Sequence, residues 1–202
     1  MDKAMSQKID KRFEKYHSFL SSKKFFDIAL SRMEVPFFIS TFPPEAQNYL
    51  DKRIINLRNK LAGEGIEVLV LDLYDLVLGI LEKKGHLSLL MEREPTLDKA
   101  KFLKGLRSML DVEKAIVPEI EGKLRSREYR MIFLTGVGLV YPYLRTHSIL
   151  SNLQRLFREC PLVVFFPGKY QYTRSKGYTL NLFGLMPGDN YYRAFDLDEY
   201  AV

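Results

Sequence analysis

The sequence predicts an α/β fold, built as a single three-layer domain over residues 1–202 with a mainly parallel sheet. Two observations predict this class. First, several runs that are apolar at nearly every position end at turn residues, and such runs are typical of strands covered on both faces. Second, these runs alternate with amphipathic helical patterns, and strand–loop–helix–strand units build parallel sheets. A chain of 202 residues is long enough to bury the core of one such domain.

The first 34 residues predict two N-terminal helices. Their apolar residues recur at helical spacing on both sides of a break at Ser21-Ser22: Ile9, Phe13, Tyr16, Leu20, Phe25, Ile28, Ala29 and Met33. A first strand follows over residues 36–41. The next helix carries one apolar stripe from Ala46 to Leu61, and the glycines at 63 and 65 end it.

The second strand runs over residues 66–71. Asp75 is a candidate cap for the helix that comes after it. Residues 92–130 are charged and helical in pattern, with two proline breaks, and they predict a helical insertion or lid. The remaining elements are a strand over 131–135, a helix over about 145–159, a strand over 162–166, a polar loop over 171–176, and short strands over 180–185 and 191–195 near the sheet edge.

Composition and charge indicate a folded cytoplasmic protein. Cys160 is the single cysteine, which excludes an internal disulfide and fits a reducing compartment. No apolar run is long enough to span a membrane, and the polar residues from Met1 to Arg12 lack the apolar core of an export signal. The formal net charge of +6 allows an acidic partner, DNA included, although most such charges belong to solvated faces.

Ligands in open parallel sheets bind beyond the carboxyl ends of the strands. Five residues at the predicted strand ends are therefore candidates for a degenerate nucleotide cleft: Ser40, Thr41, Asp72, Thr135 and Gly136. A phosphate loop needs a Gly-x-x-x-x-Gly-Lys-Ser/Thr run, which the chain lacks. The frame is therefore similar to that of a P-loop NTPase without the phosphate loop. The alternative is structural, because hydroxyls and glycines also turn the chain and aspartates also cap helices.

The sequence also lacks the signatures of other enzyme classes. The loop from Thr135 to Gly138 has no third glycine at the spacing of a dinucleotide-binding loop. The Gly-x-Ser-x-Gly elbow of a hydrolase is absent as well. His17, His86 and His147 are far apart and accompany no cysteine cluster, so no zinc site is expected. We therefore expect no enzymatic activity, no metal and no cofactor.

The polar residues that most strongly suggest a binding site lie where the helix over about 145–159 begins. Pro142 restricts the residue before it, so the helix is expected to start just beyond this proline. Five residues there are candidates for binding an anion or a partner: Arg145, Thr146, His147, Ser148 and Arg155. The structural alternative is a capped amphipathic helix whose arginine pairs with a carboxylate, and catalysis by His147 is a further alternative.

The segment from Lys169 to Tyr178 interleaves basic residues with tyrosines. Five of its residues form a candidate loop for nucleic acid or a partner: Lys169, Tyr170, Tyr172, Arg174 and Lys176. Cations contact phosphates and aromatic rings stack on bases, so the pattern suits single-stranded nucleic acid. Tyrosine and arginine also suit a protein interface, and an exposed hairpin loop without a partner is the structural alternative.

Several short sequence segments along the chain together resemble those of a known family. They are Phe37-Phe38-Ile39-Ser40-Thr41-Phe42-Pro43-Pro44, Leu71-Asp72-Leu73-Tyr74-Asp75-Leu76, Phe133-Leu134-Thr135-Gly136-Val137-Gly138 with Tyr141-Pro142-Tyr143-Leu144-Arg145, Phe165-Phe166-Pro167-Gly168-Lys169-Tyr170, and Asn190-Tyr191-Tyr192-Arg193-Ala194-Phe195. Together, from about Pro36 to Phe195, they resemble the BrxB family, a small component of the bacterial BREX anti-phage system.

The resemblance implies an accessory component without an established catalytic activity, so it supplies no catalytic residues. It also implies partners: a PglZ-like protein of the alkaline-phosphatase fold, a large ATPase and an adenine methyltransferase. The sequence and the resemblance together predict a non-enzymatic interaction component of phage defence that docks the PglZ-like partner. The alternatives are an accessory protein that binds nucleic acid and a degenerate nucleotide-binding protein.

Overall fold

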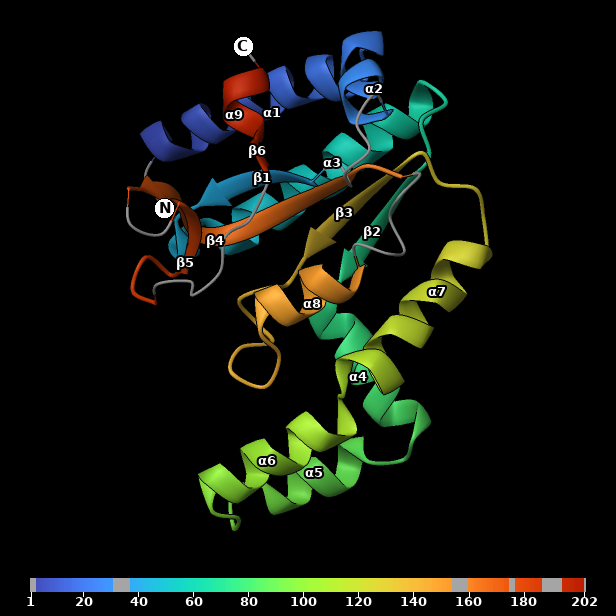
Figure 1. Cartoon of the computed structure of the whole chain (residues 1–202), viewed down its shortest axis with the longest axis vertical. Helices are drawn as coiled ribbons and strands as arrows, with labels where there is room; N and C mark the ends of the chain where they lie inside the picture. The colour runs from blue at the N-terminus through green and yellow to red at the C-terminus, as the bar shows by residue number, and fades with distance from the viewer. Residues whose placement is uncertain (1–2, 31–36, 154–159, 175–176, 187–193, 202) are drawn as a thin grey trace. The chain divides into compact units, whose positions relative to one another are not determined.

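The computed structural model describes residues 3–30, 37–153, 160–174, 177–186 and 194–201, and it confirms the α/β class with a mainly parallel sheet (Figure 1). Its six strands have the order β2-β3-β4-β1-β6, and β5 pairs with β4. The strands are β1 (Phe37–Phe42), β2 (Val68–Asp72), β3 (Met131–Thr135), β4 (Leu162–Thr173), β5 (Gly177–Leu182) and β6 (Phe195–Asp196). The four predicted strands over 36–41, 66–71, 131–135 and 162–166 are therefore confirmed.

The chain divides into two compact units, each of which is described by itself. The first unit holds residues 1–70, 129–134 and 157–202, and the second holds 71–128 and 135–156. The predicted single domain over residues 1–202 stays a prediction.

The first unit covers one face of the sheet with helices. These are α1 (Lys3–Leu20), α2 (Lys23–Leu30), α3 (Gln47–Gly63) and α9 (Leu197–Tyr200), and a 3-10 turn (Pro44–Ala46) precedes α3. Because side chains two apart in a strand share a face, Phe38 and Phe42 both enter the core under α1 and α3. The Phe13 ring of α1 stacks on Phe165 of β4, with centroids 6.0 Å apart. The predicted stripe of α3 is also in this core.

Strand pairing in the sheet follows the apolar runs. β1 and β4 are parallel, with Phe37 opposite Leu162 and Phe42 opposite Pro167. Phe38 and Ile39 point to opposite faces, and their exposed fractions are 0% and 1%. Both faces of the sheet are therefore covered, as a three-layer α/β fold requires and as the continuous apolar runs predict.

β4 continues well past the predicted end of its strand. It runs to Thr173 and pairs with β5 in antiparallel register, from Gly168 opposite Leu182 to Thr173 opposite Gly177. The predicted polar loop over 171–176 is therefore wrong at 171–173, because cross-strand pairing satisfies that backbone despite its polar side chains. A Cβ on Gly168 would lie 2.2 Å from the Asn181 carbonyl oxygen, so only glycine lets the two strands approach this closely.

The short strands near the sheet edge differ from the prediction by a few residues. β5 ends at Leu182, so the predicted strand over 180–185 is confirmed only in its first half and the chain turns over 183–185. β6 pairs in parallel with β1 through Phe195 and Asp196. Residues 191–193 of the predicted last strand lie outside the described residues.

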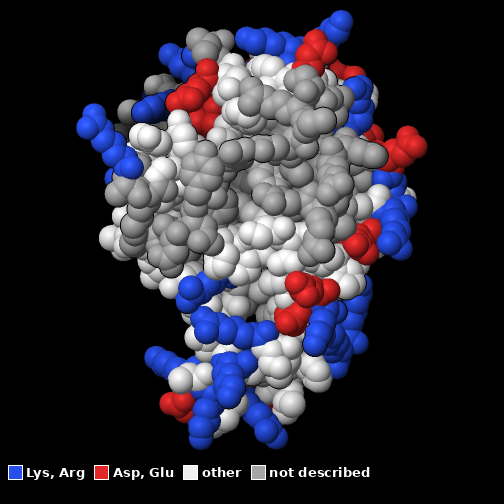
Figure 2. Space-filling model, viewed as in Figure 1, with Lys and Arg blue, Asp and Glu red and all other residues white. Residues whose placement is uncertain are grey.

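The second unit consists of helices with short connections. They are α4 (Leu73–Lys83), α5 (Leu87–Arg93), α6 (Lys99–Met109), the π-helix η2 (Val112–Ile116), α7 (Val117–Arg125) and α8 (Thr146–Leu153). Asp98 caps α6 by accepting from the backbone N–H groups of Ala100 and Lys101. Lysine and arginine side chains gather over α5 and α6 (Figure 2). No helix among the described residues is both long and apolar enough to cross a bilayer.

Candidate functional site

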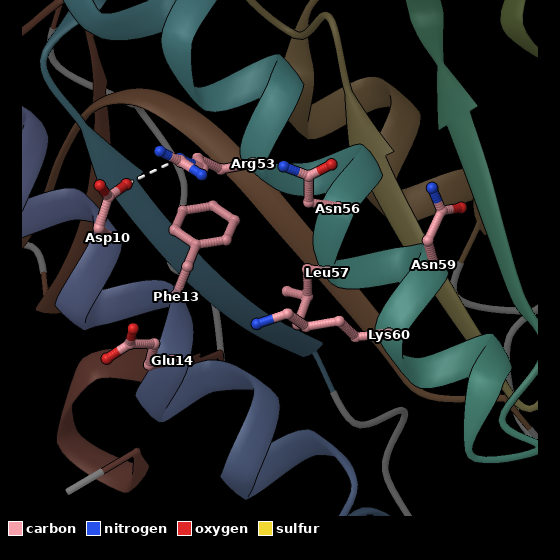
Figure 3. Close-up of a pocket in the computed structure, with 8 residues that line it drawn as sticks. All are labelled: Asp10, Phe13, Glu14, Arg53, Asn56, Leu57, Asn59 and Lys60. Carbon is pink, nitrogen blue, oxygen red and sulfur yellow. Dashed lines mark ion pairs between the residues drawn. The ribbon is translucent and has the colours of Figure 1, made fainter.

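A polar pocket of about 410 Å³ lies between α1 and α3 (Figure 3). It is lined by Asp10, Phe13, Glu14, Arg53, Asn56, Leu57, Asn59 and Lys60. Arg53 Nε donates to Asp10 at 2.7 Å, and the Tyr49 hydroxyl donates to the same carboxylate oxygen at 2.7 Å. Arg53 also donates to the Tyr49 hydroxyl at 2.6 Å. These three groups satisfy one another, so this side of the pocket ties α1 to α3.

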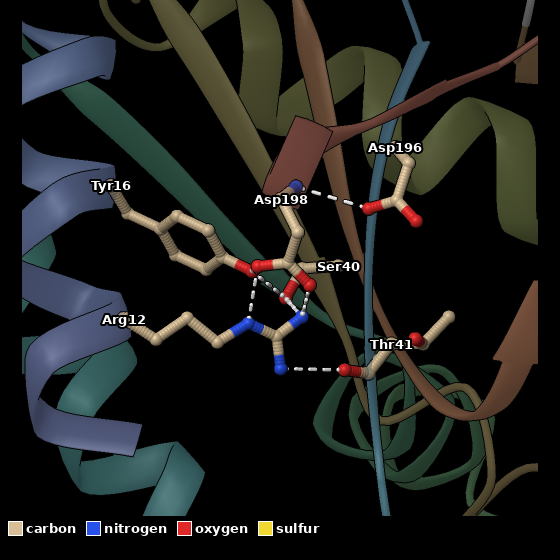
Figure 4. Close-up of polar contacts among 6 residues, drawn as sticks. All are labelled: Arg12, Tyr16, Ser40, Thr41, Asp196 and Asp198. Atoms are coloured by element: carbon tan, nitrogen blue, oxygen red, sulfur yellow. Dashed lines mark hydrogen bonds and ion pairs between the residues drawn. The ribbon is translucent and has the colours of Figure 1, made fainter. Parts of the chain in front are cut away.

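A second polar cluster joins α1, β1 and α9 around the guanidinium of Arg12 (Figure 4). Arg12 donates to both carboxylate oxygens of Asp198, and its Nη1 donates to the Thr41 carbonyl at 2.7 Å. The Tyr16 hydroxyl donates to Asp198 at 2.7 Å and lies 3.0 Å from the Ser40 hydroxyl. Ser40 and Thr41, two of the predicted cleft residues, therefore serve this cluster.

Burial and pairing set the charges of the Arg12 cluster. Burial raises the pKa of Tyr16 above its ordinary value, so the phenol stays protonated and remains a donor. Burial alone would lower the pKa of Arg12, but Tyr16 and Asp198 outweigh it and leave that pKa raised. A bidentate ion pair between a guanidinium and a carboxylate is strong and geometrically specific. Here it holds helix α9 against α1 and β1 of the first unit.

The sequence analysis missed the Arg12 cluster for a physical reason. Tyr16 was recognised only as part of an apolar stripe, and 186 residues separate Arg12 from Asp198. The local signal was confined to Asp196, which accepts from the Asp198 backbone N–H at 3.0 Å and caps α9. A capping pattern indicates a helix start but says nothing about a distant arginine.

In the second unit, the ends of β2 and β3 meet at Asp72. Its Oδ1 accepts from the backbone N–H groups of Tyr74 at 2.8 Å and Asp75 at 3.1 Å. Its Oδ2 accepts from the Thr135 hydroxyl at 2.8 Å. Asp72 therefore caps α4, and the prediction that Asp75 is the cap was wrong, because α4 begins directly after the strand and places Asp75 in its first turn.

Gly136 allows this close approach. Its φ is +71°, and a Cβ there would lie 2.7 Å from Asp72 Oδ1. Asp72, Thr135 and Gly136, three of the predicted cleft residues, thus form one clamp at the strand ends. Both carboxylate oxygens have protein donors, which matches the structural alternative for these residues.

The predicted anion or partner site lies at the start of α8. The helix begins at Thr146, one residue later than predicted, and Arg145 is exposed just before it. The Ser148 hydroxyl lies 3.2 Å from His147 Nε2, and the Ser148 carbonyl accepts from Asn152 at 2.8 Å. Arg155 lies outside the described residues. Binding at this helix start stays a prediction.

The predicted tyrosine segment belongs to a β-hairpin made by β4 and β5, and its tyrosines lie on the two strands. The rings of Tyr170 and Tyr178 stack with centroids 5.0 Å apart, and Tyr172 tilts against Tyr178 at 5.1 Å. The Tyr170 hydroxyl donates to the Ala194 carbonyl at 2.9 Å, which fixes one end of the row. Lys169 and Arg174 are exposed, and Lys176 lies outside the described residues.

Among the described residues, no group of three or more His, Cys, Asp and Glu side chains is arranged to hold a metal ion.

Comparison with known proteins identifies the family. The family model described as BREX protein BrxB matches residues 69–197, which is more than half of the chain. The chain belongs to the BrxB family. A BREX protein BrxB of Bacillus cereus (strain H3081.97) is 34% identical over 168 residues, covering 81% of this chain and 84% of that protein. A BREX protein BrxB of Escherichia coli O9:H4 (strain HS) is 25% identical over 189 residues, covering 94% and 91%. No solved structure matches the chain.

Membership of the BrxB family makes this chain a component of the BREX system, which confirms the resemblance seen in the sequence. The BrxB model spans the Asp72 clamp, the α8 start and the tyrosine hairpin, because all of them lie within residues 69–197. Arg12 and Tyr16 precede that span, whereas their partner Asp198 follows it by one residue.

Proposed function

We propose that this BREX component is a non-enzymatic interaction protein that docks a larger partner, the PglZ-like protein of the system. The observation that carries the proposal is the set of exposed apolar side chains on α5 and on the connection between α5 and α6 in the second unit. Neither helix contains a buried residue. Leu89, Met91 and Leu97 are exposed at 44%, 68% and 40%.

Helices this short need a partner surface. α5 has 7 residues and α6 has 11. Isolated helices of fewer than about 12–15 residues are marginal in water, and most helical stability in proteins comes from packing an apolar face. Full burial of a methionine or leucine side chain contributes about 1.5–3 kcal/mol. Phe102, Leu103 and Leu106 of α6 are half-buried, so a docked protein that covers Leu89 and Met91 would add to the packing of these helices.

The charges of α6 define the partner further. The helix carries Lys99, Lys101 and Lys104, has no acidic residue, and none of these lysines has an ion-pair partner among the described residues. Lys99 and Lys101 lie in the first turn, where the helix dipole disfavours positive charge. Local helix stability therefore does not account for them, but an acidic rim on a docked partner does.

The internal hydrogen bonds of the polar candidates support a role other than catalysis. Asp72 accepts from three protein donors, and the Ser40 hydroxyl engages Tyr16 and Arg12. A nucleotide with Mg²⁺ over Asp72 would have to replace the Thr135 bond. Titration calorimetry with ATP and Mg²⁺ should give a flat trace, and a saturable heat would favour the degenerate nucleotide-binding alternative.

Co-purification tests the proposal. The tagged chain should retain the PglZ-like protein when both are expressed together, and the triple variant Met91→Glu, Lys101→Glu, Lys104→Glu should lose most of it. The control is Lys52→Glu with Ile55→Glu on α3, which makes the same kinds of change elsewhere, because Ile55 is 54% exposed and Lys52 is exposed as well.

Arg145→Glu forms the third arm and tests the α8 start. If the control and the α5–α6 variant retain the partner equally, α5 and α6 are not the dock. If wild type retains no BREX neighbour at all, the docking function itself is contradicted.

A further inference from the structure

The β4–β5 hairpin presents a row of three tyrosine rings, which we call the tyrosine row: Tyr170, Tyr178 and Tyr172. Register accounts for it, because Tyr172 lies directly opposite Tyr178 and Tyr170 is two residues before Tyr172 on the same face of β4. The first two rings are nearly parallel, at 17°, and the third is tilted at 59° to its neighbour. The row is a preformed aromatic surface.

One end of the tyrosine row is anchored and the other end is open. Tyr170 is half-buried and its hydroxyl donates to the Ala194 carbonyl at 2.9 Å. Tyr172 is 64% exposed and Tyr178 is 39% exposed. Large aromatic rings are usually among the more buried side chains, so two of them in solvent side by side need a reason. The anchored ring holds the row rigid, which leaves the open rings ready to stack on a planar ligand.

An exposed cation lies beyond the open end of the tyrosine row. Arg174 directly follows the end of β4, two residues after Tyr172. Among the described residues, Arg174 forms no ion pair. Lys169 is also exposed, but it projects from the opposite face of β4, because side chains alternate along a strand. Rings that stack on bases together with cations that contact phosphates are the combination by which proteins hold single strands without reading sequence. A duplex buries the faces of its bases, so stacking on the row favours a single strand.

We propose that the tyrosine row binds single-stranded nucleic acid, with bases stacked on Tyr172 and Tyr178 and a phosphate held by Arg174. This site is separate from the docking of a BREX partner by α5 and α6, and it does not depend on it. It would give the protein a means of sensing single-stranded DNA or RNA. Since the chain has no tryptophan, its fluorescence comes from its 12 tyrosines, and comparison with the Tyr172→Ala variant assigns the quenching to the row.

The test is a titration of the full chain with fluorescein-labelled (dT)20, followed by anisotropy and by quenching of tyrosine fluorescence. Wild type should bind at low salt and prefer the single strand to a duplex of the same length. Tyr172→Ala should weaken binding about 5- to 150-fold, whereas Tyr172→Phe, which keeps the ring, should stay within about 3-fold. Tyr74→Ala is the matched control, because Tyr74 is also exposed, at 40%, but lies on α4.

Salt dependence tests the cation. Each phosphate contact with a single strand adds about −0.7 to the slope of log K against log [salt], so Arg174→Ala should reduce the slope by about 0.7. Two controls, Lys169→Ala on the opposite face of β4 and Lys101→Ala on α6, should leave the slope unchanged. Absence of binding by wild type at low salt overturns the proposal. Binding by Tyr172→Ala at wild-type strength also overturns it and would leave the row as a protein contact.

Discussion

The Asp72 clamp leads to a prediction that separates a structural carboxylate from a catalytic one. The perturbations are Thr135→Val, which removes the hydroxyl donor, and Asp72→Ser, which keeps a side chain able to cap α4 but removes the acceptor of the Thr135 bond. Both variants and their combination form a double-mutant cycle. Because the hydroxyl donates to Asp72 Oδ2 at 2.8 Å and Thr135 is only 5% exposed, the two side chains should be strongly coupled.

The expected magnitude follows from the individual bonds. A hydrogen bond to a charged group contributes about 1.5–3 kcal/mol, so each single variant should lower the free energy of unfolding by about 2 kcal/mol. The double variant should lower it by little more than either single variant, which gives a coupling energy of about 1.5 kcal/mol. Asp72→Ala also removes the helix cap, which contributes about 1 kcal/mol, so its total loss should be about 3 kcal/mol.

The assay is urea unfolding followed by circular dichroism. For a urea m-value of about 2 kcal/mol/M, a loss of 2 kcal/mol lowers the midpoint by about 1 M. Asp72→Asn, which can still cap and still face Thr135, should stay near wild type in stability and in phage resistance. Strictly additive losses, or an Asp72→Ala variant as stable as wild type, would refute the clamp. An Asp72→Asn variant of full stability without phage resistance would indicate a chemical role for the carboxylate.

Three further predictions follow from the first unit. Gly168→Ala should lower the free energy of unfolding by more than about 2 kcal/mol, measured in urea, because its Cβ would lie 2.2 Å from the Asn181 carbonyl oxygen; an unchanged midpoint would contradict this. Arg12→Met should lose about 1–2 kcal/mol of stability, since it removes the bonds to the half-exposed Asp198 carboxylate and to the Thr41 carbonyl, whereas Arg53 is more exposed than Arg12 and Arg53→Met should lose less than about 1 kcal/mol; equal losses would argue against the fastening role. Burial raises the pKa of Cys160 to about 12, so the thiol of the folded protein should react with iodoacetamide at pH 8 far more slowly than the thiol of the urea-unfolded protein. The free energy of unfolding should also fall as the pH rises from about 9 towards 12, because only the unfolded chain then loses the thiol proton. Rapid labelling of the folded protein would contradict the prediction.

The sheet could be predicted from the sequence because its strands are apolar at almost every position. Such runs, as in Val68–Asp72 and Met131–Thr135, need a cover on both faces and leave little choice of structure. The continuation of β4 to Thr173 could not be predicted in the same way. Gln171 and Thr173 alternate with tyrosines and look like loop residues, and only pairing with β5 makes them a strand.

The candidate site was only partly predictable. Asp72 was placed correctly at a strand end, and its structural alternative, a helix cap, is the role that the hydrogen bonds show. The partnership with Thr135 depends on strand order, which sequence patterns do not determine. Arg12 and Asp198 meet only after folding, since no periodicity relates residues 186 positions apart. Exposure of Leu89 and Met91 is likewise a tertiary property, because a leucine-rich helix normally predicts burial.

The most direct measurement of the docking claim is titration calorimetry of the purified chain with the purified PglZ-like protein at several temperatures. The account predicts saturable binding with a clearly negative heat-capacity change, because exposed apolar side chains such as Met91 leave water on docking. It also predicts that the variant with Met91→Glu, Lys101→Glu and Lys104→Glu binds much more weakly than the α3 control. An absence of heat at every temperature, or equal binding by both variants, would contradict it.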